Sequence, residues 1–327
     1  MGRSHQPRSG SLQYYHRRRS KRIYPRIRAW AQNASKEPRI LGFAGYKVGM
    51  THIAYKDTNP NSPTKNENIF CPVTVLECPP LRLLSIKFYG NTYGRKVLIG
   101  QEFAPKLEKE LKRKIIPPKK TKQENTDSIL SKATEIRLEV YTQPRLTGVG
   151  KKKPEIFELA LTNLNPKTQY DYAKSLFDKE IRVQEIFKEG QFIDIHAVTK
   201  GKGLQGAVKR FGVSLKSHKS EKKRRSAGNL GAWTPKKVSF RVPQKGQMGF
   251  HTRTEYNKAL ILINSDPKII NPKDGFSHYG YIKNDFVLIK GSVAGARKRL
   301  IRLNEPIRSK EPQRNFDVTH ISVESKQ

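Results

Sequence analysis

The segment Ile40-Leu41-Gly42-Phe43-Ala44-Gly45-Tyr46 is the first of ten short apolar runs along the chain. Most of these runs are rich in Val, Ile or Phe and are bounded by Gly, Pro or Asn. Short strands with such boundaries are typical of a barrel or a sandwich, so the sequence predicts a mainly β body. The other nine runs span Val73–Leu76, Leu83–Phe88, Lys96–Phe103, Ile136–Tyr141, Arg182–Phe187, Phe192–Val198, Ala259–Ile263, Asp285–Ile289 and Arg299–Leu303.

Residues 105–180 depart from this strand pattern and predict an α-containing insertion in the β body. Lys and Glu alternate with widely spaced apolar residues in the first helical candidate, as on a surface helix. The last candidate carries Tyr170, Ala173 and Phe177 on one stripe. The three expected helices span Lys106–Lys114, Asp127–Ala133 and Lys167–Lys179.

The chain carries a large excess of positive charge, and two segments hold most of it. Its 327 residues include 65 Lys and Arg against 28 Asp and Glu, which gives a formal net charge of +37. Residues 1–39 contribute +10 and residues 201–250 contribute +12. This distribution predicts two basic extensions on a moderately basic body, and it calls for a strongly anionic partner.

Several classes of protein are set aside by the same sequence. No apolar run approaches the roughly 20 residues of a membrane-spanning helix, and the N-terminus lacks the apolar stretch of a signal peptide. Cys71 and Cys78 are too few for a disulfide scaffold or a thiolate metal site, so reduced, structural cysteines are expected. We therefore expect a soluble, intracellular protein.

One motif imitates an enzyme's cofactor site. Gly201–Gly206 matches the G-x-G-x-x-G pattern of dinucleotide sites, but Glu221, near the distance of a ribose-binding acid, lies in a Lys/Arg-rich stretch rather than a second strand. The same glycines would let the backbone approach an RNA phosphate. The histidines form no metal-type pair, and no nucleophile elbow or Walker loop is present. We expect no catalytic residue, no cofactor and no metal.

Aromatic residues within both basic segments indicate more than charge neutralisation. The first segment interleaves Tyr14, Tyr15, Tyr24 and Trp30 with its arginines, and the second places Trp233 between glycine and proline. Such rings are suited to contacts with folded RNA. The alternatives are a disordered polybasic tail or targeting signal for the first segment, and a Trp packed on the protein's own surface for the second.

Six segments in chain order carry a recognisable pattern: Pro7–Leu12, Leu41–His52, Thr199–Gly212, Gly231–Trp233, Gly246–Gly249 and Gly275–Gly280. Together they resemble the large-subunit ribosomal protein L-three family in its archaeal and eukaryotic form. Ser9 stands where the family usually has His. Glu221 stands where some eukaryotic members have a methylated His, and Gln247 fits a glutamine that is methylated in some bacterial members.

The resemblance implies a fold and a function. Family members have a closed β-barrel of the translation-factor/reductase-isomerase type, with an α-containing insertion and two long basic extensions. They are structural constituents of the large ribosomal subunit and not enzymes. They bind large-subunit rRNA near its 3′ end, nucleate early assembly and send a Trp-tipped finger toward the peptidyl transferase centre. The implied partners are this rRNA and neighbouring ribosomal proteins in the cytoplasm, with no membrane, small-molecule substrate or homo-oligomer.

The expected organisation places an N-terminal extension at residues 1–39, the barrel body at 40–104, 181–200 and 259–327, the insertion at 105–180, and the central extension at 201–258. The expected finger tip is Gly231, Ala232 and Trp233. The candidate rRNA-binding residues are Arg8, Arg17, Arg18, Arg19, Lys21, Arg22, Arg28, Trp30, Lys200, Lys202, Lys209, Arg210, Lys216, Lys222, Lys223, Arg224, Arg225, Trp233, Lys236, Lys237, Arg241, Lys245, Gln247 and Arg253.

Two other functions stay open on the residues alone. A nucleotide-dependent RNA-modifying enzyme would use Gly201–Gly206 and would bind a labelled nucleotide cofactor saturably. A general polybasic nucleic-acid or chromatin-compacting protein would bind unrelated duplexes alike at matched salt, because phosphate neutralisation carries no sequence information.

Overall fold

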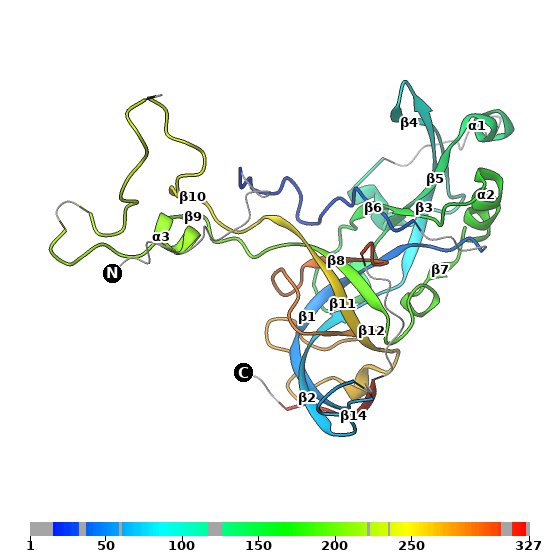
Figure 1. The fold of residues 1–327 in the computed structure, drawn as a ribbon. Coiled ribbons are helices and arrows are strands. Elements are labelled where there is room, and N and C mark those ends of the chain that lie inside the picture. The colour runs from blue at the N-terminus through cyan, green and yellow to red at the C-terminus, as the bar shows by residue number, and fades with distance from the viewer. Residues whose placement is uncertain are drawn as a thin grey trace. The chain divides into compact units, whose positions relative to one another are not determined.

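The chain divides into two compact units. Unit 1 comprises Met1–Ile23 and Val198–Arg253, and unit 2 comprises Tyr24–Ala197 and Thr254–Gln327. The computed structural model describes residues 16–32, 37–58, 61–116, 126–220, 223–234, 236–308 and 316–324 (Figure 1).

Strands dominate the described residues, so the predicted mainly β class is confirmed. The strands are β1 (Gly42–Lys56), β2 (Asn68–Glu77), β3 (Leu81–Thr92), β4 (Arg95–Phe103), β5 (Glu135–Tyr141), β6 (Ile156–Ala160), β7 (Glu180–Ile181), β8 (Phe192–Val198), β9 (Leu204–Gln205), β10 (Gly246–Gln247), β11 (Thr252–Asn264), β12 (Phe286–Lys290), β13 (Leu300–Asn304) and β14 (Asp317–Ile321). The helices are α1 (Thr126–Lys132), α2 (Pro166–Ser175) and α3 (Ala207–Phe211), with 3₁₀ turns at Lys109–Arg113, Pro144–Leu146, Val183–Glu185 and Pro267–Ile269. None of the helices in these described ranges has the length and apolarity to cross a bilayer.

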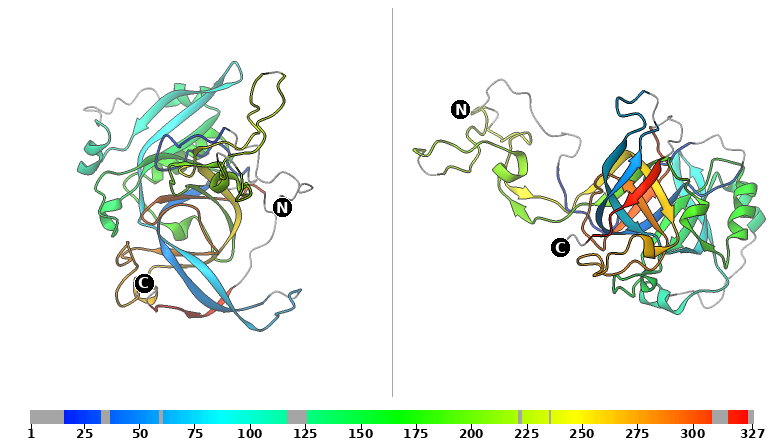
Figure 2. Two further views of the ribbon diagram at one scale, coloured as in Figure 1. Left: turned by 90° about the vertical axis from the view of Figure 1, so that its left-hand side faces the viewer. Right: turned by 90° about the horizontal axis from the view of Figure 1, so that it is seen from below.

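The larger sheet has seven strands in the order β13-β8-β11-β12-β2-β1-β14. β1 is long enough to serve three partners. Its first residues, Gly42–Tyr46, pair with β13, its last residues, Ile53–Lys56, pair with β14, and Tyr46–Lys56 pairs with β2. Because β13 also pairs with β1, the pairing returns on itself through six strands, which curve around a common interior in Figure 2.

The smaller sheet has the order β4-β3-β5-β6, with β7 paired to β3. α1 and α2 lie against it (Figure 1). Of its strands, β3 and β4 come from the predicted body, whereas β5 and β6 come from the predicted insertion at 105–180. The sheet therefore spans that boundary, and the division into body and insertion stays a prediction.

One hydrophobic core contains side chains from both sheets. Phe43 and Tyr46 of β1 and Phe88 of β3 are almost completely buried in it. The Tyr46 hydroxyl donates a hydrogen bond to Glu155 Oε2 at 2.9 Å, and burial raises the pKa of this phenol well above its usual value. Cys71 and Cys78 are buried and unpaired, in keeping with the expected structural role.

Two predicted elements take a different form. The predicted strand Arg182–Phe187 is wrong, because Val183 and Phe187 are both buried at helical spacing and Phe187 N donates to Val183 O at 3.0 Å. The predicted helix Lys106–Lys114 is reduced to the 3₁₀ turn Lys109–Arg113, which buries only Leu111. α1 and α2 confirm the other two predicted helices, and Tyr170 and Ala173 are buried on the expected stripe.

Candidate nucleic-acid interface

A small two-stranded antiparallel sheet of β9 and β10, called the hairpin base below, forms the base of the central basic segment in unit 1. β9 and β10 pair antiparallel, and next to them Lys202 N donates to Met248 O and Met248 N donates to Gly203 O, both at 2.9 Å. Gly249, with φ +73°, makes this approach possible, since a Cβ there would lie 2.1 Å from Lys200 O. Of the glycines predicted to approach an RNA phosphate, Gly201 and Gly203 thus pack beside the backbone of Met248 and Gly249, whereas a Cβ at Gly203 or Gly206 would meet nothing within 4 Å.

The N-terminal segment of unit 1 is hydrogen-bonded to this hairpin base. Ser20 N donates to Phe250 O at 2.7 Å, and His251 Nδ1 lies 2.9 Å from Arg18 O. Burial lowers the pKa of His251, and the nearby guanidinium groups lower it further, although the bond to Arg18 O acts in the opposite direction. A neutral ring that donates through Nδ1 fits this contact.

Arg17 and Arg210 both contact the ring of Phe211, and these three residues are called the clamp below. Their guanidinium carbons lie 4.6 and 5.0 Å from the centroid of the Phe211 ring. Arg17 Nη1 donates to Arg210 O at 3.2 Å, and Arg210 donates to the carbonyl oxygens of Gln244 and Gln247 at 3.0 and 3.2 Å. These two arginines, predicted as RNA contacts, thus hold segments of unit 1 together.

The described residues of unit 1 include many basic side chains and no acidic one. They include nineteen Lys and Arg and no Asp or Glu, so no ion pair forms among them. The ion pairs in the described parts of the chain lie in unit 2, for example Arg39–Glu305 and Arg82–Glu180. Unit 1 therefore has the charge distribution of a surface that binds a polyanion.

The finger segment, residues 213–245, has no buried side chain among its described residues. Trp233 is 84% exposed and lies in a turn that Lys236 N closes by donating to Trp233 O at 2.7 Å. Gly231 N donates to Asn229 Oδ1 at 2.8 Å just before it. The alternative of a Trp packed on its own protein is therefore not what the structure shows.

Most of the predicted binding residues are exposed, and a smaller group is half-buried. The half-buried ones are Arg17, Trp30, Arg210, Lys216, Gln247 and Arg253. The exposed ones, together with the tip residues Gly231 and Ala232, are Arg18, Arg19, Lys21, Arg22, Arg28, Lys200, Lys202, Lys209, Lys223, Arg224, Arg225, Trp233, Lys236, Lys237, Arg241 and Lys245. Arg8 and Lys222 lie outside the described residues.

Arg28 and Trp30 belong to unit 2, whereas the other described candidate residues belong to unit 1. The Trp30 ring packs against the hydrophobic core, with the guanidinium carbon of Arg302 at 5.7 Å from its centroid. Gln247 donates through Nε2 to Gly249 O at 3.0 Å, so its side-chain amide stabilises the hairpin base.

Sequence reasoning missed the exposed apolar residues that accompany Trp233. Leu215, Leu230, Val238 and Phe240 are all about half exposed or more. The available signal was their occurrence without helical or strand periodicity inside a Lys/Arg-rich stretch, which leaves them no core to fill.

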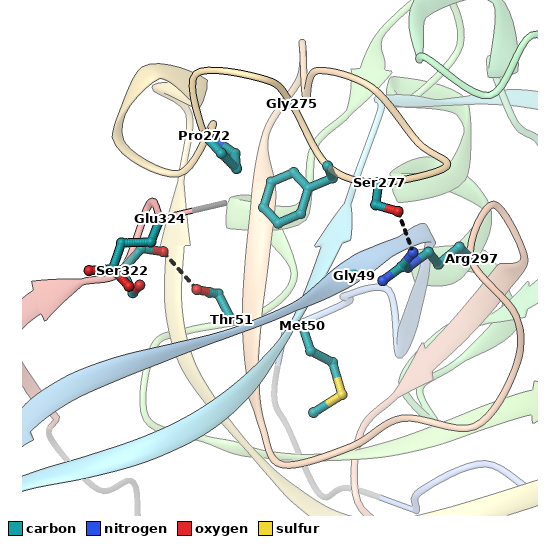
Figure 3. Close-up of a pocket in the computed structure, with 10 residues that line it drawn as sticks. Gly49, Met50, Thr51, Pro272, Gly275, Ser277, Arg297, Ser322 and Glu324 are labelled. Atoms are coloured by element: carbon teal, nitrogen blue, oxygen red, sulfur yellow. Dashed lines mark hydrogen bonds between the residues drawn. The ribbon is translucent and has the colours of Figure 1, made fainter. Parts of the chain in front are cut away.

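No described feature resembles a cofactor or metal site. Gly201–Gly206 follows β8, which pairs antiparallel with β13 rather than within a parallel nucleotide-binding unit. A cavity between β1 and the loop 272–277 measures about 20 Å³, enough for one water molecule (Figure 3). Arg297 at its rim donates to Ser277 Oγ at 3.1 Å. The described ranges contain no cluster of three potential metal-binding side chains.

Comparison with known proteins decides the family. The model of the family described as Ribosomal protein L3 matches residues 1–327. The chain belongs to this family. Similar proteins of the L3 family, each named large ribosomal subunit protein uL3, include those of Archaeoglobus fulgidus, with 45% identity over 99% of this chain and 98% of the relative, and of Methanobrevibacter smithii, with 43% identity over 100% and 99%.

Membership of the L3 family confirms the resemblance found in the sequence. It also confirms the expectations that follow directly from it, namely a non-enzymatic ribosomal protein of the archaeal type that is located in the cytoplasmic ribosome. The RNA-modifying enzyme is thereby set aside, and the false cofactor motif is explained as part of the family's central segment.

Proposed function

We propose that this chain is a structural constituent of the large ribosomal subunit that binds large-subunit rRNA through unit 1. Family membership over all 327 residues supports the assignment. The observation that carries the RNA-binding role is the composition of the described part of unit 1, which includes nineteen Lys and Arg and no Asp or Glu. Binding of RNA stabilises such a surface, because its cations neutralise phosphates and release the counterions that the phosphates held.

The basic residues of unit 1 fall into two roles in this proposal. Exposed side chains such as Lys209, Lys223 and Arg224 contact phosphates and supply affinity that is independent of sequence. Arg17 and Arg210 keep the segments of unit 1 in one arrangement through their contacts with Phe211 and backbone carbonyls. Shape fixed in this way allows one RNA surface to be favoured over others.

The finer features that we propose follow the family resemblance. They are a closed barrel formed by the six-strand ring, binding near the 3′ end of the rRNA, a role in early subunit assembly, and contacts with neighbouring ribosomal proteins. The cyclic pairing of β13 with β1 supports the barrel. The exposure of Trp233 on a segment without buried side chains supports a finger that reaches toward the peptidyl transferase centre.

Trp233→Ala tests the finger. Because the ring is exposed, the free energy of unfolding should change by less than about 0.5 kcal/mol. Large subunits reassembled with the variant should lose chemical protection of rRNA bases at the peptidyl transferase centre and should translate more slowly. Thr234→Ala, next to Trp233 and equally without a buried contact, is the control and should leave both readouts unchanged. Normal protection and translation with Trp233→Ala would refute the finger.

A general polybasic binder makes a different prediction. Such a protein would bind an unrelated duplex as tightly as the rRNA at matched salt and would leave large subunits in a high-salt wash. We expect the chain to stay with the subunit and to prefer the rRNA, because shape adds to phosphate neutralisation.

A further inference from the structure

A β-turn in the finger segment presents Phe240 and Arg241 next to each other. Val242 N donates to Ser239 O at 3.1 Å and closes the turn. Arg241 N also donates to Ser239 Oγ, at 3.3 Å. Phe240 and Arg241 therefore occupy the two central positions of the turn, and both residues are exposed.

The two side chains are arranged as a pair. The guanidinium carbon of Arg241 lies 5.8 Å from the centroid of the Phe240 ring, within the range of a cation–π contact. Phe240 is 59% exposed, and none of the described side chains of the finger segment is buried, so its ring does not serve a core. An exposed ring of this kind gains free energy when a partner covers it.

We propose that Phe240 and Arg241 form a stacking platform for one unpaired base of the large-subunit rRNA. The inference rests on the rRNA binding proposed above and assigns a second contact to the finger, apart from Trp233. Aromatic rings and guanidinium planes are the surfaces on which unpaired RNA bases stack. Arg241 also brings a charge that can neutralise a flanking phosphate.

The surroundings favour RNA over a protein as the partner. The described residues of the finger segment carry nine Lys and Arg and no acid. Lys237 and Lys245 lie on either side of the turn in sequence, and both are exposed. A protein partner would have to supply many carboxylates, whereas the backbone next to an unpaired base supplies phosphates at every nucleotide.

The test compares variants of the full chain in binding a 3′-domain fragment of large-subunit rRNA at several salt concentrations. Phe240→Ala and Phe240→Leu should weaken binding about 5- to 100-fold with the same salt dependence, since a stacked base is lost without a change of charge. Phe240→Trp should bind like the wild type. Val238→Ala removes another exposed apolar side chain of the same segment and should change affinity less than twofold.

Base-specific chemical probing gives a second readout. One unpaired base that the wild-type chain protects should become reactive with Phe240→Leu and stay protected with Phe240→Trp. If Phe240→Leu binds and protects like the wild type, or if Val238→Ala has the same effect as Phe240→Ala, the platform is refuted. If the wild-type chain fails to bind the fragment at all, the proposed function falls and this inference falls with it, which distinguishes the two failures.

Discussion

The close contact at Gly249 makes a quantitative prediction about unit 1. Gly249→Ala should loosen the hairpin base, because a Cβ at this position would lie 2.1 Å from Lys200 O and 3.0 Å from Lys202 N. The left-handed backbone, with φ +73°, costs an Ala roughly 1–2 kcal/mol. The clash moves Lys200 and Lys202 and weakens one or two neighbouring hydrogen bonds, each worth about 1 kcal/mol. The expected loss of local stability is about 2–4 kcal/mol.

Amide hydrogen exchange on the full chain measures this loss directly. The amides of Lys202 and Met248, which form the two hydrogen bonds beside β9 and β10, should exchange about 30- to 1,000-fold faster in Gly249→Ala. Amides of the larger sheet, such as those of β2 and β12, should keep their protection.

Gly212→Ala is the matched control for this experiment. Gly212 has nearly the same backbone angle, φ +70°, but nothing lies within 4 Å of a Cβ built there. Its variant should therefore show only the conformational cost, close to the C-terminus of α3. Equal effects of the two substitutions would mean that the contact between Gly249 and Lys200 does not hold the hairpin base together, and would contradict the predicted clash.

Two more predictions concern the sheets and the clamp. Burial lowers the pKa of His196 from 6.5 to about 4, and the charge of Arg302 contributes to the same shift. The neutral ring therefore contributes its full stabilisation above pH 6.5, and the free energy of unfolding should fall by about 3 kcal/mol as the pH drops to 4. Urea unfolding between pH 7 and 4 should show this loss in the wild type and not in His196→Gln, whereas the exposed His320→Gln should behave like the wild type. Lys209→Ala should reduce the salt dependence of rRNA binding by about one phosphate contact and leave amide exchange unchanged. Arg210→Ala should instead speed exchange at Met248, and the reverse pattern would contradict the two roles assigned to these neighbours.

The sequence was a good guide to strands and a poor guide to their pairing. The runs Phe192–Val198 and Ile136–Tyr141 are strands because their β-branched and aromatic residues suit a pleated sheet, which buries the first on both faces and the second mainly on one. Which strands pair depends on the whole chain, so the joining of β3 to β5 across the predicted boundary at residue 104 could not be read locally. The sequence pattern does not predict β6, because its five residues follow closely on the charged stretch Lys151–Lys153.

At the interface, charge was predictable and packing was not. The exposed lysines follow from composition, since a cluster of like charges without acids finds no partner inside the protein. Trp30 shows the limit of that reasoning. Tyr24 and Ile27 are buried, and this apolar spacing carries Trp30 onto the core of unit 2 although arginines surround it in sequence. Arginines on both sides in sequence therefore do not by themselves place an aromatic ring on an RNA-binding surface, and an RNA contact through the half-buried Trp30 stays a prediction.

Arg17 and Arg210 explain how a segment with so much charge keeps a defined shape. Two guanidinium groups beside one Phe ring repel each other. Each of them also donates to backbone carbonyl oxygen, so the two arginines hold segments of unit 1 together despite this repulsion. Bound RNA phosphates reduce the remaining repulsion between the two arginines, because their negative charge then surrounds unit 1. RNA binding should therefore stabilise the clamp as well as the complex, and exchange at the Met248 amide should slow on adding rRNA. Unchanged exchange in the complex would mean that the clamp is independent of the RNA and that the charges of Arg17 and Arg210 serve unit 1 alone.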